Sequence, residues 1–311
     1  MSTKLLLDVD PGNDDAIATF VALANEDVDV VGLTTVMGNT TLENATHNAL
    51  SLLELVDRAD VPVAAGAARP LSDDLETAEH VHGPGGLPED VRAELPEPTA
   101  EPIDAHAVEF IVEQAREHGE DLTIAAVGPS TNLALAIALE PELPDLVGNI
   151  FLMGGAMKTT GNVTPQASFN FYVDAPAASR VVQEANPKIV GLDVTEHVYV
   201  GTDEIERLLD EPAPLSTIAK ILAFSVDEVK SKFGHDGGLA SDAVVVSDVI
   251  GGLLTFEAAY VEIDTTGGPS NGATIYDEHG VLGREPNARV ALEIDHDAYP
   301  EIVLENLEKL A

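Results

Sequence analysis

Short apolar runs alternate with longer segments of helical periodicity over most of the chain. Runs rich in Val, Ile and Leu predict strands at residues 5–9, 28–36, 61–65, 122–127, 150–153 and 189–194. Helical spacing of apolar residues predicts helices at residues 14–24, 42–57, 104–118, 131–139, 175–185 and 215–230. Continuous apolar strands between helices are typical of a parallel sheet that helices cover on both faces. We therefore predict an α/β fold with a mainly parallel central sheet flanked by helices.

The later part of the chain is more helical. It shows strand candidates at residues 260–265 and 288–294 and a closing helix at residues 299–310. Residues 67–102, which are rich in Pro, Gly and acidic residues, predict a long loop, and long loops in compact domains are more often functional than idle. No linker divides the chain, so we expect one domain over residues 1–311 with a Rossmann-like core.

The charge balance is extreme, with 55 acidic and 15 basic residues and a net charge of −40 at pH 7. Recognition of phosphate backbones requires Lys and Arg clusters, so we exclude nucleic acid and membranes as partners. The chain has no cysteine, which excludes disulfides and thiolate metal sites. Its N-terminus is too acidic for a secretory signal, so we expect a cytoplasmic location. Acid spread through a well-patterned chain also indicates a halophile, in whose salt-rich cytoplasm counterions screen self-repulsion.

The stretch LLLDVDPGNDD at residues 5–15 places four aspartates after a buried strand, at Asp8, Asp10, Asp14 and Asp15. Ligands of open parallel sheets bind at that edge. A helix dipole favours acids in the first turn by roughly 0.3–1 kcal/mol each, which accounts for Asp14 or Asp15 but not for Asp8 and Asp10. The stretch from Asp8 to Asp15 holds no Lys or Arg to neutralise these charges, so we predict a bound cation. Ca²⁺ and Mg²⁺ both prefer such oxygen ligands.

The short motif alone leaves the reaction open. A strand that ends in Asp-x-Asp is also similar to the opening of haloacid-dehalogenase-type phosphatases, in which Asp8 would be the nucleophile and Mg²⁺ the ion. The reaction must therefore be inferred from the remaining motifs of the chain.

Eight motifs occur in the same order as in one enzyme family. They are DVDPGNDD at residues 8–15, TTVMGN at 34–39, HVHG at 80–83, VGPSTN at 127–132, MGG at 153–155, GN at 161–162, FN at 169–170 and GLDVT at 191–195. By these motifs the chain resembles the inosine–uridine-preferring nucleoside hydrolase family along nearly its whole length. The resemblance implies hydrolysis of the N-glycosidic bond of ribonucleosides to free base and ribose.

The resemblance also implies roles for particular residues. Ca²⁺ would be held by Asp10, Asp15, the backbone carbonyl of Val127 and Asp242, and Asp10 would act as general base on a metal-bound water. The substrate-binding positions would be Asp14, Asn39, His82, Met153, Asn162, Ser168 and Asn170, with His82 lining the base pocket. Members of the family form homodimers or homotetramers, so we expect a homo-oligomer.

Two positions depart from the family pattern. Ser168 stands where many members have a glutamate that binds the ribose 5′-hydroxyl, and Ser241 stands where a histidine protonates the departing base. His235 could supply that proton from another backbone position, or it could lie idle in a Gly-rich loop. We therefore keep two alternatives to the hydrolase, namely a phosphohydrolase that uses Asp8 and a non-catalytic descendant that binds nucleosides or sugars.

Overall fold

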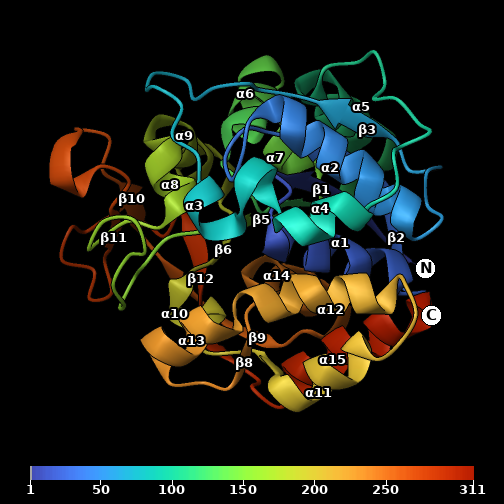
Figure 1. Ribbon diagram of the computed structural model, residues 1–311. Coiled ribbons are helices and arrows are strands. Elements are labelled where there is room, and N and C mark those ends of the chain that lie inside the picture. Colours follow the sequence, from blue (N-terminus) through green and yellow to red (C-terminus); the bar gives the residue numbers. More distant parts are fainter. Residues whose placement is uncertain (1) are drawn as a thin grey trace.

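An eight-stranded sheet runs through the centre of the computed structural model, which describes residues 2–311 (Figure 1). In order across the sheet, the strands are β3 (Val63–Ala65), β2 (Val28–Thr35), β1 (Thr3–Val9), β4 (Leu122–Ala126), β5 (Asn149–Met153), β6 (Lys188–Val190), β12 (Ala288–Ile294) and β9 (Leu254–Ala259). Neighbouring strands are parallel except at the edge, where β9 pairs antiparallel with β12. The predicted α/β fold with a mainly parallel sheet is confirmed.

Helices cover both faces of the sheet, and the side chains of β1 show why. Leu5, Leu7 and Val9 join one apolar cluster and Leu6 joins the other, because successive residues of a strand point to opposite faces. The first cluster includes residues of α1 (Asn13–Ala24), α2 (Leu42–Leu55), α12 (Leu215–Phe224), α14 (Ser241–Gly251) and α15 (Ala298–Leu307). The second includes residues of α5 (Ala107–His118), α6 (Thr131–Leu139) and α9 (Ala175–Ala185).

Shorter elements connect these layers. The short helices are α3 (Glu79–His82), α4 (Glu89–Glu94), α7 (Leu143–Leu146), α8 (Phe169–Val173), α10 (Leu192–Thr195), α11 (Thr202–Leu209) and α13 (Val226–Phe233). Two small antiparallel pairs join β7 (Val200–Gly201) to β8 (Gly237–Gly238) and β10 (Val261–Ile263) to β11 (Thr274–Tyr276). Single 3₁₀ turns lie at Pro84–Gly86, Gly119–Asp121, Gly268–Ser270 and Glu308–Leu310. Between residues 2 and 311, no helix has the length and apolar character needed to cross a bilayer.

Several predicted elements need correction. The strand predicted at residues 189–194 ends at Val190, and residues 192–195 form α10, whose first turn holds Asp193. The loop predicted at residues 67–102 contains α3 and α4. Strand β9 escaped prediction because it is an edge strand whose side chains are mostly exposed or half-buried, so its sequence shows no continuous apolar run.

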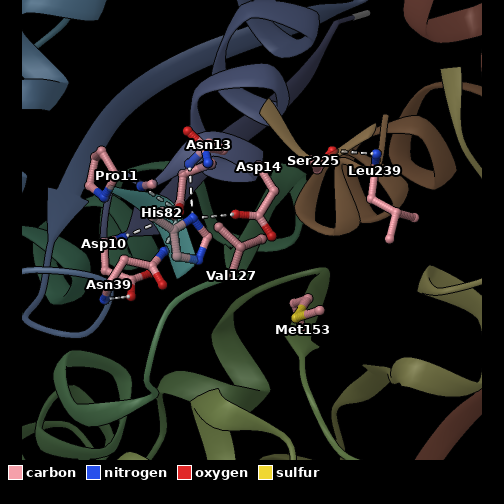
Figure 2. A network of polar contacts seen from close by, with 12 residues as sticks. Asp10, Pro11, Asn13, Asp14, Asn39, His82, Val127, Met153, Ser225 and Leu239 are labelled. Carbon is pink, nitrogen blue, oxygen red and sulfur yellow. Dashed lines mark hydrogen bonds and ion pairs between the residues drawn. The ribbon is translucent and has the colours of Figure 1, made fainter. Parts of the chain in front are cut away.

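The helix predicted at residues 215–230 is two helices, and the break lies at Ser225. The Ser225 hydroxyl donates to the backbone oxygen of Leu222 at 3.2 Å and accepts from the backbone N–H of Leu239 at 2.9 Å. Figure 2 shows the second of these bonds. The break lets α13 leave the line of α12, and residues of both helices line the cavity described below.

Tyr299 joins α15 to the start of α14. Its side chain is fully buried, and its hydroxyl donates to the backbone oxygen of Ala240 at 2.9 Å. Tyr299→Phe removes one of the two donors to that carbonyl, which still accepts the backbone N–H of Ala243 at 3.1 Å. We therefore expect a loss of about 1 kcal/mol in the free energy of unfolding. Denaturant titration in high salt measures this loss.

Tyr260→Phe is the matched control, because the Tyr260 hydroxyl donates only to the exposed Glu262 carboxylate at 3.3 Å. We expect that change to stay within about 0.5 kcal/mol. Equal effects of the two substitutions would contradict a stabilising role for the bond to Ala240.

Candidate functional site

Residues from four strand ends meet at one edge of the sheet. Asp10 follows β1, Asn39 follows β2, and Val127 follows β4. Met153 ends β5, and Asp242 enters from the first turn of α14. A cavity of about 210 Å³ opens here, and Asn39, Val127, Met153 and Asp242 line it. The carboxyl edge of the sheet is therefore the candidate site, as its parallel topology predicts.

Three carboxylates form the closest cluster in the site. One oxygen each of Asp14, Asp15 and Asp242 lie within 4.8 Å of one another. Asp15 is fixed by the turn before α1, since its carboxylate accepts the backbone N–H of Asp10 at 3.0 Å and that of Gly12 at 2.9 Å. The first turns of α1 and α14 therefore bring three carboxylates together as a compact set of oxygen ligands.

Asp10 lies beside this cluster and is held rigidly. Its Oδ2 accepts the backbone N–H of Asn39 at 2.6 Å, and its side chain is 1% exposed. Gly38 and Gly128 pack against it so closely that an added Cβ would lie 2.0 Å and 2.5 Å from its two carboxylate oxygens. The two family glycines therefore make room for a buried carboxylate.

The charges of the cluster are not neutralised by basic side chains. Burial raises the pKa of Asp10 and of Asp242 well above the usual range, and repulsion from neighbouring carboxylates raises both further. Burial also raises the pKa of Asp14 and of Asp15 to about 6. The ion pairs formed among residues 2–311 bring no Lys or Arg to these four groups.

This donor set fits a hard divalent cation. Oδ1 of Asp14 is buried and has no hydrogen-bond partner within the described residues. Several adjacent carboxylate oxygens, one of them unsatisfied, are the ligand chemistry that Ca²⁺ and Mg²⁺ require. The described cluster comprises Asp14 with Asp15 and Asp242, whereas the sequence assigned Asp14 to the sugar and Asp10 to the ion.

Asp8 lies outside the cavity lining. It is fully buried, and its Oδ1 accepts from the Thr34 hydroxyl at 2.6 Å and from Nδ2 of Asn132 at 2.8 Å. Burial raises its pKa to about 7. These contacts tie three neighbouring elements together behind the site, so Asp8 has a structural position.

The predicted substrate-binding residues all line the cavity, and several also support one another. Nδ2 of Asn170 donates to the backbone oxygen of Val127 at 2.5 Å and to that of Met153 at 3.2 Å. Oδ1 of Asn162 accepts the backbone N–H of Phe169 at 2.9 Å. The Ser168 hydroxyl accepts the backbone N–H of Gly155 at 2.6 Å, so it holds the turn after β5.

His82 lies on α3 and lines the cavity. Figure 2 shows its ring beside Asn13 and Asp14. Its Nδ1 accepts the backbone N–H of Asn13 at 3.2 Å and lies 3.8 Å from Oδ1 of Asp14. Burial lowers its pKa to about 4, so the ring is neutral near neutral pH. A Cβ at Gly12 would lie 2.6 Å from both His82 and Asn39, so this glycine lets the two side chains approach the turn.

His235 does not line the cavity. Its ring stacks on Tyr199 with centroids 4.8 Å apart, so the structure does not bring it to the other predicted site residues. The cavity wall instead includes Glu196, Glu228 and Lys232, which sequence reasoning missed. The Ser-x-x-Glu spacing at residues 225–228 is typical of the start of a helix. It could have predicted the break before α13, the helix that carries Glu228 and Lys232.

Comparison with known proteins agrees with the geometry. The sequence model of the inosine-uridine preferring nucleoside hydrolase family matches residues 5–301. The chain is 40% identical to an Escherichia coli O7:K1 protein named pyrimidine-specific ribonucleoside hydrolase RihA, with 99% of each chain covered.

Solved structures give the same result. A plant nucleoside hydrolase matches with a TM-score of 0.91 and 30% identity over 99% of both chains. A purine-preferring ribonucleoside hydrolase from Gardnerella vaginalis matches with a TM-score of 0.90 and 28% identity, over 99% of this chain and 98% of that one. The chain therefore belongs to the inosine–uridine-preferring nucleoside hydrolase family, the enzymes that hydrolyse N-glycosyl bonds of nucleosides.

Proposed function

We propose that this ribonucleoside hydrolase is calcium-dependent and that water attacks C1′ of the ribose directly. The observation that carries the proposal is the set of buried, unneutralised carboxylates beside a cavity lined by amides. Such a wall suits a neutral, hydroxyl-rich ligand next to a cation. No Ser, Thr or Lys nucleophile is required by this arrangement.

Asp10, Asp15, Asp242 and the backbone oxygen of Val127 would hold the ion, and Asp14 is near enough to contribute. Ca²⁺ is favoured over Mg²⁺ because it accepts a larger and less regular set of oxygen ligands. When bound, the cation would polarise water and orient ribose hydroxyl groups.

The residues of the chain supply the rest of the chemistry. Asp10 would accept a proton from the attacking water, because its carboxylate lies beside the cation cluster and is held in place by the backbone N–H of Asn39. Breaking the C1′–N bond builds positive charge on the sugar, and the surrounding carboxylates stabilise that charge. Asn39, Asn162 and Asn170 would orient the ribose.

The position of Asp8 argues against the phosphohydrolase. A nucleophile must reach the substrate, whereas Asp8 is fully buried and is absent from the cavity wall. The non-catalytic alternative makes a different prediction, namely binding of nucleosides without release of base.

We further propose that pyrimidine ribonucleosides are the substrates and that the protein is a homo-oligomer. The substrate proposal is supported by 40% identity over 99% of the chain to the relative named pyrimidine-specific. The structural match named purine-preferring is less similar in sequence, at 28% identity. Chromatography of free base released from a panel of pyrimidine and purine nucleosides tests the preference.

Asp10→Asn should lower kcat for uridine hydrolysis by about 10²–10⁴-fold, because it removes the proton acceptor while it keeps the side-chain shape. Asp145→Asn, at an exposed position on α7, is the control and should leave kcat unchanged. Release of free base in molar salt with Ca²⁺ is the measurement. Retention of full activity in Asp10→Asn would contradict its role.

Calcium should stabilise the folded protein, because only the folded chain assembles the carboxylates. At a concentration of about 100 times Kd, binding adds about 2.7 kcal/mol to the free energy of unfolding. Asp242→Asn should lose this increment, yet be at least as stable as wild type in chelator, since it removes one buried charge. Thermal unfolding with Ca²⁺, Mg²⁺ or chelator measures both effects, and equal stabilisation by the two ions would contradict a calcium preference.

A further inference from the structure

Departure of a nucleoside base is helped by a proton donor, and the proposed roles of the carboxylate cluster do not include one. When the C1′–N bond breaks, its electron pair stays on the base, so a proton donor at the base lowers the barrier. His82 is neutral and uses Nδ1 to accept from the backbone, and His235 lies outside the cavity. His80 lines the cavity from the same short helix as His82. A carboxyl group of the cavity wall is another candidate for the donor.

Glu196 is a cavity-lining carboxyl group outside the cation cluster. It directly follows α10, and its side chain is half-buried. Within residues 2–311, no hydrogen bond or ion pair engages that carboxyl group. By contrast, the nearby Asp193 accepts the backbone N–H groups of Met157 and Lys158 at 2.8 Å and 2.7 Å. Asp193 therefore has a structural task, whereas Glu196 is free to act on a ligand.

The surroundings of Glu196 favour its protonated form more than solvent would. Its pKa is raised to about 6, mainly by burial; the charge of Lys232 opposes this rise and the charge of Asp193 adds to it. Lys232 lies on α13 and forms an ion pair with Glu228 of the same helix, and both line the cavity. Helix α14, which contacts α10, presents Ser241 and Asp242 to the cavity. Ser241 is too weak an acid to serve as the donor.

We propose that Glu196 is the general acid that protonates the departing base, an inference that rests on the proposed hydrolysis. The C1′–N bond breaks and its electron pair goes to the base. The proton of the Glu196 carboxyl group moves to a ring nitrogen or carbonyl oxygen of that base. The water oxygen bonds to C1′, and the proton lost by the water goes to Asp10. Glu196 is left as a carboxylate, which takes a proton from solvent before the next cycle.

The test compares two leaving groups in Glu196→Gln. Uridine needs a proton at its base, whereas p-nitrophenyl β-D-ribofuranoside releases a stable phenolate without one. We expect kcat to fall by about 10²-fold or more for uridine and to stay within about twofold for the nitrophenyl riboside. The loss of kcat for uridine toward alkaline pH should be present in wild type and absent in the variant. Glu196→Asp should recover part of the uridine activity.

Controls separate this proposal from the proposed function. Glu117→Gln, at an exposed position on α5, should match wild type on both substrates, and retained stabilisation by Ca²⁺ should show that Glu196→Gln is folded. Equal losses on both substrates, or no loss on either, would overturn the role of Glu196 while leaving the hydrolase intact. A wild-type protein that cleaves neither substrate would overturn the proposed function and this inference together.

Discussion

Several like charges are buried at one sheet edge without a basic partner, and the surrounding structure is arranged around them. Asp8, Asp10, Asp15 and Asp242 are each at most 2% exposed. Burial of an ionised carboxylate is costly unless hydrogen bonds or a cation offset it. Asp8 and Asp15 accept donors from neighbouring elements, and Asp10 accepts one backbone N–H. A divalent cation is the natural means of offsetting what remains.

The parallel sheet makes this concentration of charge possible. Turns after adjacent strands β1, β2 and β4 bring distant residues within hydrogen-bond distance, and α14 adds Asp242 from far along the chain. Glycine at positions 38 and 128 allows the backbone of two of these turns to lie against Asp10. The same turns place Asn39 and Val127 on the cavity wall. Charge burial and ligand access thus depend on one set of backbone turns.

Sequence periodicity predicted the sheet and most of its strands, because buried parallel strands have continuous apolar runs. The DVDPGNDD motif identified the site, since its charge has no partner nearby in the chain. Edge strand β9 was missed because its sequence shows no continuous apolar run. The break at Ser225 was missed because it interrupts the helical apolar pattern only weakly. Those misses matter for function: the break places Glu228 and Lys232 on the cavity wall, and an isolated Glu196 cannot be distinguished from the other acids of so acidic a chain. His235 was predicted for the site from chemistry alone, and tertiary structure placed it against Tyr199 instead.

Salt screens the exposed acids of the surface differently from the buried acids of the site, although both groups contribute to the net charge of −40. In molar salt the screening length falls to about 3 Å, so repulsion between exposed acids largely disappears. Fields between buried carboxylates are screened much less, because mobile ions cannot enter the protein between them. High salt would therefore weaken the repulsion between surface acids without removing the attraction of the site for a divalent ion. An origin in a salt-rich cytoplasm remains a prediction, and it is compatible with a cation-dependent active site. The carboxylate ligands of that site require no adaptation to high salt.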